Sequence, residues 1–264
     1  MAAEAAPFGA VLVTRPTGEA ADALVATLRS EGFRVHHRPL LELHPLEALS
    51  PPAHAAVVDL DLYQHVIFIS ANAVRFGLER IDNYWPQLPV GLAWYAIGEA
   101  TAALLSDRGI DARSPGEDMT SEGLLALPPL ASVGDDRVLL VKGEGGRDTL
   151  RRELESRGAR VDELSCYRRA CPDLARGALA AELADEGIAT VLLSSGEGLA
   201  NFRRLLSPAE FSNFSYLCLV VPSARVARQA REAGFATVVT AANASDRAML
   251  RALKNLDPAP ETRQ

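Results

Sequence analysis

Two runs of the chain have the same pattern and lie a nearly constant number of residues apart. Residues 11–43 read as a strand, a turn, an amphipathic helix with a glycine stop and a second extended run, and residues 138–169 follow the same order. Leu28 and Gly32 of the first run correspond to Leu154 and Gly158 of the second, an offset of 126 residues. A repeat at a long, fixed offset indicates that the fold is built from equivalent units.

Three further pairs of segments extend this repeat in the same order. Residues 68–74 correspond to 193–199, residues 96–102 to 220–226 and residues 120–125 to 244–249, at offsets of 125, 124 and 124. A single match could arise by chance, because strand–turn–helix units look alike, and one α/β sheet of generic units is the alternative. Four pairs in the same order favour two structurally equivalent halves.

Short apolar runs alternate with amphipathic helical segments along the whole chain. This alternation predicts parallel sheets, because each return to a parallel strand needs a crossover connection. We therefore expect an α/β fold with two doubly wound parallel-sheet lobes, and 48% hydrophobic residues in 264 supply two cores. Two half-polar extended runs, residues 34–43 and 159–169, are expected to pair antiparallel and to bridge the lobes.

Composition excludes several classes of protein. A net charge of −7 argues against a nucleic-acid binder, which would be basic. No apolar run is long enough to span a bilayer, and the start of the chain has no basic, apolar signal segment, so we expect a cytoplasmic protein without membrane contact. Cys166, Cys171 and Cys218 lack metal-ligand spacing, and we expect no metal.

The ends of the predicted strands carry small, hydroxylated and basic residues, and few carboxylates. Ligands of open α/β sheets collect at these ends, where helix N-termini and closely approachable backbone N–H groups favour anions. Each residue alone is also what the start of a helix requires. The candidate binding residues are Thr14, Arg15, Ser70, Ala71, Asn72, Gly98, Thr101, Lys142, Gly145, Gly146, Arg147, Ser194, Ser195, Ser223 and Arg225.

Known cofactor and hydrolase signatures are missing. The sequence has no GxGxxG after its first strand, no GxxxxGK[ST], no GxSxG and no HExxH. The histidines lie outside the strand ends and form no set with a serine and an aspartate. These observations favour chemistry without a cofactor, or a binding role without chemistry.

Taken together, the motifs resemble the uroporphyrinogen-III synthase family over residues 10 to 255. They are Thr14-Arg15-Pro16, Ser70-Ala71-Asn72-Ala73-Val74, Ile97-Gly98 with Thr101, Ser121-Glu122-Gly123-Leu124, Lys142-Gly143 with Gly146-Arg147, Tyr167-Arg168-Arg169, Ser194-Ser195 and Ser223-Ala224-Arg225. The resemblance implies one lobe of residues 1–35 with 170–264, a second of residues 44–158, and bridging strands at 36–43 and 159–169. It also implies that no cofactor is used. We expect a monomer.

The substrate implied by the resemblance is hydroxymethylbilane, a linear tetrapyrrole with many carboxylates. The family closes it into a ring with inversion of ring D, after loss of the terminal hydroxyl and through a spiro intermediate. Tyr167, which corresponds to the family's tyrosine, is the candidate catalytic residue, because a phenol can donate a hydrogen bond to the departing hydroxyl. The alternatives are a non-enzymatic bilobal binder of an anionic small molecule and a nucleotide-sugar glycosyltransferase.

Overall fold

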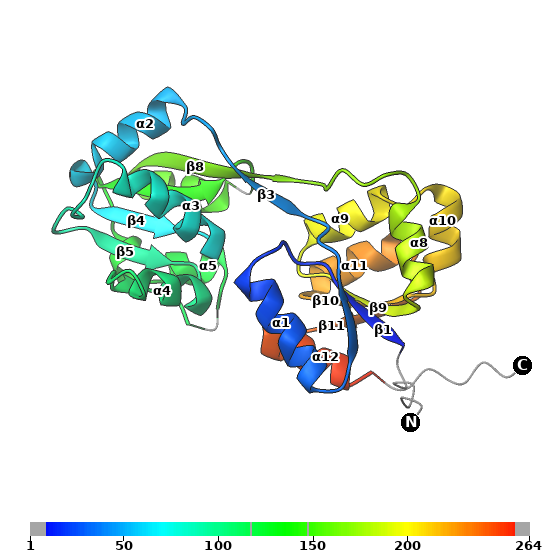
Figure 1. Cartoon of the computed structure of the whole chain (residues 1–264). Coiled ribbons are helices and arrows are strands. Elements are labelled where there is room, and N and C mark those ends of the chain that lie inside the picture. Colours follow the sequence, from blue (N-terminus) through cyan, green and yellow to red (C-terminus); the bar gives the residue numbers. More distant parts are fainter. Residues whose placement is uncertain (1–8, 117, 147, 257–264) are drawn as a thin grey trace, which may run out of the picture. The chain divides into compact units, whose positions relative to one another are not determined.

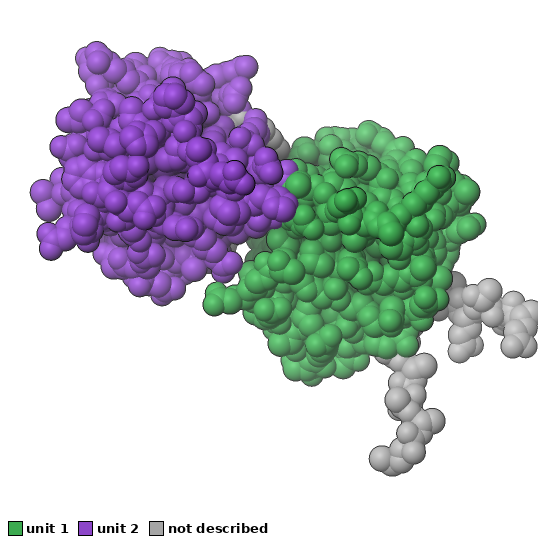
Figure 2. All heavy atoms as spheres, turned by 45° about the horizontal axis from the view of Figure 1, so that its top comes forward, with its two compact units in different colours: residues 1–42, 170–264 green, residues 43–169 purple. Residues whose placement is uncertain are grey.

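The computed structural model describes residues 9–116, 118–146 and 148–256 (Figure 1). The chain divides into two compact units, which Figure 2 shows in green and purple. Unit 1 is formed by residues 1–42 together with 170–264, and unit 2 by residues 43–169. No helix within the described ranges is both long enough and apolar enough to cross a membrane.

Unit 1 contains a five-stranded sheet with the order β11-β10-β9-β1-β2, and every adjacent pair is parallel. Its strands are β1 (Ala10–Val13), β2 (Arg34–His37), β9 (Ile188–Leu192), β10 (Cys218–Val221) and β11 (Thr237–Thr240). Its helices are α1 (Glu19–Ser30), α8 (Ala178–Asp185), α9 (Gly196–Arg204), α10 (Pro208–Phe214), α11 (Ala224–Glu232) and α12 (Asp246–Lys254).

Strand β1 shows why unit 1 has three layers. Val11 and Val13 pack with side chains of α1 and α12, whereas Leu12 packs with side chains of α8, α9 and α11 on the other face. Alternate side chains of a strand point to opposite faces, so a strand covered by helices on both faces reads as a continuous apolar run. All four β1 residues are fully buried.

Unit 2 contains a six-stranded sheet with the order β3-β8-β7-β4-β5-β6, parallel from β8 to β6. Its strands are β3 (Glu42–Pro45), β4 (His65–Phe68), β5 (Ala93–Ala96), β6 (Ala112–Arg113), β7 (Arg137–Gly143) and β8 (Arg160–Ala170). Its helices are α2 (Pro51–Val58), the 3₁₀ turn η1 (Leu60–Leu62), α3 (Ala71–Asp82), α4 (Glu99–Ser106), α5 (Ser121–Leu125), α6 (Pro128–Ala131) and α7 (Thr149–Ser156).

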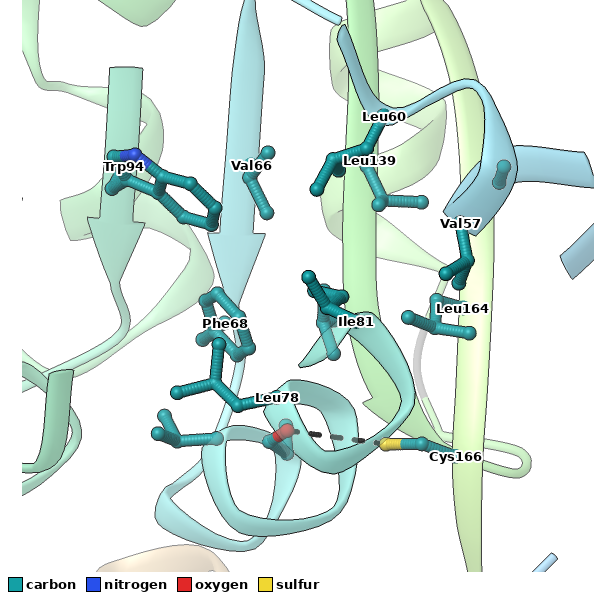
Figure 3. Close-up of a cluster of buried hydrophobic side chains, with 14 of the residues drawn as sticks. Val57, Leu60, Val66, Phe68, Leu78, Ile81, Trp94, Leu139, Leu164 and Cys166 are labelled. Atoms are coloured by element: carbon teal, nitrogen blue, oxygen red, sulfur yellow. Dashed lines mark hydrogen bonds between the residues drawn. The ribbon is translucent and has the colours of Figure 1, made fainter. Parts of the chain in front are cut away.

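The core on one face of the unit 2 sheet lies beneath α2, α3 and α4. Figure 3 shows Phe68 and Leu139 of the sheet facing Leu78 and Ile81 of α3. Cys166 of β8 belongs to the same cluster, and its thiol lies 3.9 Å from the carbonyl oxygen of Ala73 in α3. Burial raises the pKa of the Cys166 thiol to about 12, so this cysteine stays protonated and takes part in packing.

Helix α3 approaches the sheet closely because Gly77 faces it. A methyl group on Gly77 would lie 2.4 Å from Cγ1 of Val141 and 3.4 Å from the Phe68 ring. Val141 is fully buried and β-branched, so moving its side chain to another rotamer would cost conformational energy. We therefore expect Gly77→Ala to lower the free energy of unfolding by about 1–3 kcal/mol, as overpacked cores do. Thermal melting checks this, and a melting temperature equal to that of the wild type would contradict it.

The prediction of an α/β fold with parallel sheets is confirmed, whereas the predicted bridging pair needs correction. Residues 34–37 form β2, which pairs parallel with β1, so His36 and His37 belong to unit 1. Residues 160–167 pair parallel with β7. Only the short β3 lies beside β8, and the half-polar look of both runs reflects their places near sheet edges. Pro128 and Pro129 begin the short helix α6, because proline fits a first helical turn.

Candidate functional site

The carboxyl edge of the unit 2 sheet carries two helix starts. Ser70 follows β4 and is the N-cap of α3, where its hydroxyl accepts a hydrogen bond of 2.9 Å from the Ala73 N–H. Gly98 follows β5 and is the N-cap of α4. Helix geometry leaves the N–H groups of Ala71 and Asn72, in the first turn of α3, without intrahelical acceptors. The edge therefore presents backbone donors of the kind that bind anions.

A pair of hydroxyl groups lies at the start of α3. The Tyr167 phenol oxygen is 3.1 Å from the Ser70 hydroxyl oxygen, although the two residues are 97 positions apart in the chain. One of the two hydroxyl hydrogens makes the bond between the Ser70 and Tyr167 oxygens, whichever residue donates it. The other hydroxyl hydrogen of the pair is then available to a third partner.

Two neighbours hold the Tyr167 ring in place. The ring stacks on Phe76 of α3 with a centroid separation of 5.3 Å and an interplanar angle of 30°. The ring also lies against Gly143, where a methyl group would come within 2.6 Å of Tyr167 Cζ. Tyr167 is only 3% exposed and Ser70 is half-buried, so the Ser70 hydroxyl is the more accessible member of the pair.

Lys142, which was expected to bind a ligand, makes an ion pair within unit 2. Its ammonium group lies 2.9 Å from a carboxylate oxygen of Glu163, and the Lys142 side chain is 6% exposed. Lys142 has the same parity along β7 as Leu140, which packs against α7, so it points to the face of the sheet opposite Gly143 and Tyr167. The structure therefore separates Lys142 from the Ser70–Tyr167 pair.

The ion pair makes Lys142 dependent on Glu163. Glu163→Ala leaves a buried ammonium group without its carboxylate, which we expect to lower the free energy of unfolding by about 1–3 kcal/mol. Lys142→Met fills the same space without a charge and is expected to cost less. Chemical denaturation of both variants checks the order, and the reverse order would contradict it.

The other unit 2 candidates lie around this edge. Thr101 is buried in α4, and the Met119 side chain covers Gly98, whose added Cβ would lie 2.6 Å from Met119 Cγ. Gly145 and Gly146 follow β7 with φ of 71° and 94°, a left-handed conformation that favours glycine. Arg147 lies outside the described residues.

The carboxyl edge of the unit 1 sheet is a second group of candidates. Thr14 follows β1 and is 4% exposed, and its hydroxyl donates a hydrogen bond of 2.7 Å to the carbonyl of Leu192 at the end of β9. The Thr14 hydroxyl hydrogen is thus used to brace two strands. Arg15 makes hydrogen bonds to Ser194, Ala20, Ala244 and Asp246, so its side chain is also engaged within the unit.

Three serines of this edge lie at helix starts or in the connection before one. Ser195 is the N-cap of α9 and accepts from the Gly198 N–H at 3.0 Å, and Ser223 is the N-cap of α11 and accepts from the Val226 N–H at 3.4 Å. Ser194, between β9 and α9, is half-buried. Arg225 is exposed and donates to Gln229 one turn further along α11.

The candidates thus form one group in each unit, and sequence reasoning missed several of their partners. The missed partners are Glu163 of Lys142, Phe76 of Tyr167 and Asp246 of Arg15. Each of these contacts is tertiary and leaves no local signal in the sequence. Among the described residues, no group of three or more His, Cys, Asp or Glu side chains is arranged to hold a metal ion.

Sequence comparison finds relatives over most of the chain. A model of the family described as uroporphyrinogen-III synthase HemD matches residues 22–251. The uroporphyrinogen-III synthase of Salmonella typhimurium is 35% identical over 251 residues, covering 92% of this chain and 99% of the relative. The enzyme of the same name from Escherichia coli gives the same identity and coverage.

Two solved structures with a similar fold carry the same enzyme name as these relatives. The uroporphyrinogen-III synthetase of Helicobacter pylori matches with a TM-score of 0.61 at 14% identity, covering 94% of this chain and 100% of that one. A mutant uroporphyrinogen III synthase from Thermus thermophilus matches with a TM-score of 0.58 at 18% identity, covering 93% and 98%. At these identities the structures support the fold, and the sequence relatives support the family.

Proposed function

Since the chain belongs to the uroporphyrinogen-III synthase family, we propose that it cyclises hydroxymethylbilane to uroporphyrinogen III and water. The reaction closes the linear tetrapyrrole with inversion of ring D, as part of haem biosynthesis, and makes the chain a cyclising lyase. The observation that carries a mechanism is the Ser70–Tyr167 pair at the start of α3.

The pair supplies the proton that the first step needs. Loss of the terminal hydroxyl breaks a carbon–oxygen bond, and that hydroxyl leaves as water once it has gained a proton. Tyr167 donates either directly or through Ser70, whose hydroxyl bonds to the phenol. The proton returns when the attacking pyrrole loses its own proton after ring closure, so the pair ends as it began. The reaction is redox-neutral and needs no electron carrier.

Each of the two carboxyl edges offers groups that suit the substrate's carboxylates. Ser70, Ser195, Ser223 and Gly98 begin helices with backbone N–H groups that favour anions. The substrate also closes without an enzyme, to the isomer that is not inverted, so the protein accelerates one outcome chiefly by positioning. Tyr167 is catalytic in this proposal, and Ser70, Gly98, Ser194, Ser195 and Ser223 bind the substrate.

We also propose that the two units arose by internal duplication. If β2, β1, β9, β10 and β11 of unit 1 are matched to β8, β7, β4, β5 and β6 of unit 2, these five strands have the same order in both sheets, and β3 is an additional strand of unit 2. The matching is the one that the sequence repeat gives. The N-caps agree as well, since Ser70 and Ser195 have φ/ψ of −169°/160° and −158°/162°.

We propose further that the protein works as a cytoplasmic monomer on this small-molecule substrate, with neither nucleic acid nor membrane as a partner. The support is the net charge of −7, which disfavours nucleic acid as a partner. Size-exclusion chromatography with light scattering measures the oligomeric state, and a stable dimer would contradict this part.

The experiment is to incubate the purified protein with freshly made hydroxymethylbilane and to separate the products by chromatography after oxidation. We expect the inverted isomer to dominate, whereas a reaction without protein gives the other isomer. A protein that binds the tetrapyrrole but leaves the isomer ratio of the uncatalysed reaction unchanged would favour the non-enzymatic binder.

A further inference from the structure

Arg15 is the most extensively bonded side chain at the carboxyl edge of unit 1. Its Nε donates to the Ser194 hydroxyl at 3.0 Å, its Nη2 donates to the Ala244 carbonyl at 2.5 Å, and its Nη1 contacts the Asp246 carboxylate. Arg15 itself follows β1, Ser194 follows β9, and Ala244 and Asp246 lie where the connection from β11 enters α12, whose first residue is Asp246. One guanidinium group therefore joins three of the loops that form the edge.

The Arg15 side chain is 12% exposed, and the Asp246 carboxylate offsets its charge. Because Arg15 donates hydrogen bonds to several acceptors within the unit, few of its N–H groups are available to a ligand. Lysine could not reproduce this planar arrangement of donors. Its sequence motif suggested a direct contact with substrate, and the geometry suggests a different role.

The direction of the bond to Ser194 is unambiguous. A guanidinium has donors and no acceptor, so the Ser194 oxygen must accept, and its own hydrogen points elsewhere. Among the residues that the structure describes, none accepts this hydrogen. Donation from a cation also polarises the hydroxyl and strengthens it as a donor.

We infer that Arg15 is a positioning residue, which holds the half-buried Ser194 hydroxyl so that its hydrogen is donated to a carboxylate of the substrate. This inference rests on the proposed function for the identity of the substrate. Ser194 makes the contact, and Arg15 acts through it. Asp246 and the Ala244 carbonyl keep the guanidinium in place.

The test is a double-mutant cycle with Arg15→Met and Ser194→Ala. Each single change should raise the KM for hydroxymethylbilane about threefold to tenfold, the loss of one hydrogen bond, and leave kcat nearly unchanged. The double variant should be no worse than either single variant. Lys254→Ala is the matched control, because it removes the ion pair to Glu31 at the other end of α12, and it should leave KM unchanged.

Two results would overturn the inference. One is that the effects of the two changes multiply, and the other is that Arg15→Met lowers the melting temperature without changing KM. If Arg15→Met does not fold, the same cycle is run with Asp246→Asn, which loosens the guanidinium and keeps its Nε donor. The Asp246→Asn effect on KM should then vanish in the Ser194→Ala background.

A second readout separates this inference from the proposed function. The same cycle is measured as the Kd for uroporphyrin, a tetrapyrrole polycarboxylate, by fluorescence titration. Coupling between Arg15 and Ser194 in this Kd, from a protein that forms no inverted isomer, would support the inference and refute the proposed function. Formation of the inverted isomer without coupling between Arg15 and Ser194 would support the proposed function and refute the inference.

Discussion

Tyr167→Phe is expected to slow formation of the inverted product by roughly 10²–10⁴-fold, the scale of a positioned proton donor. The ring remains, so its stacking on Phe76 and its contact with Gly143 should survive. Only the hydroxyl that bonds to Ser70 is lost. Because the uncatalysed closure continues at its own rate, the inverted isomer should also fall as a fraction of total product. Chromatography of the oxidised products measures both quantities.

Tyr63→Phe is the matched control for this experiment. Tyr63 is 3% exposed, as Tyr167 is, and its hydroxyl donates a hydrogen bond of 2.7 Å to Asp162. Burial and the Asp162 carboxylate raise the pKa of the Tyr63 phenol, which keeps it protonated. Its loss should reduce stability and leave the isomer ratio unchanged. A folded Tyr167→Phe protein with the wild-type rate and ratio would remove Tyr167 from the mechanism.

The contact between Ser70 and Tyr167 allows a double-mutant cycle on kcat. If Tyr167 and Ser70 act as one unit, their effects on kcat should not multiply. Ser70→Gly is the suitable partner, because glycine remains an acceptable N-cap, whereas alanine would also cost α3 its cap. A Tyr167→Phe, Ser70→Gly double variant whose rate loss is the product of the two single losses would show that the residues act independently.

Gly143→Ala is expected to lower kcat by about 10²-fold although it removes no hydroxyl group. The new methyl group would lie 2.6 Å from Cζ and 2.7 Å from Cε2 of Tyr167, so the ring must move and the bond to Ser70 must stretch. Misplacing a catalytic group by about 1 Å has effects of this size. Steady-state kinetics measure the loss, and near-ultraviolet circular dichroism follows the displaced ring.

Gly134→Ala is the control for adding a methyl group just before the same strand. Its Cβ would have only the Arg157 carbonyl oxygen nearby, at 3.9 Å, so no neighbour needs to move. We expect wild-type kinetics from it. Wild-type kinetics from a folded Gly143→Ala protein would mean that the position of the Tyr167 ring is unimportant.

The sequence predicts the elements of this fold better than their partners. The buried runs before Thr14, Ser70 and Ser195 are strands, because apolar residues followed by a capping residue have a local signature. Residues 34–37 were misassigned, because a half-polar run fits any sheet edge, and its pairing with β1 depends on the path of the whole chain. The capping box of α10, formed by Ser207 and Glu210, was readable and was missed.

The candidate site shows the same division. Ser70 and Tyr167 were each predicted from the sequence, but their contact was not, since 97 residues separate them. Lys142 was expected to meet a ligand, and its partner Glu163 became evident only with the register of β7 against β8. Arg15 and Asp246 lie 231 positions apart, so no spacing rule relates them. Residue types at strand ends were predictable, and their pairings required the fold.

The position of β1 has a consequence for how the chain folds as it is made. β1 lies between β9 and β2 in the sheet of unit 1, so after β1 leaves the ribosome it lacks one neighbouring strand until residues 188–192 follow. Unit 2 is continuous in sequence, and domains tend to fold as they emerge. We therefore expect unit 2 to fold before unit 1 during translation, while the apolar β1 waits for β9 on one side. That interval is the stage at which a nascent chain of this kind most needs a chaperone.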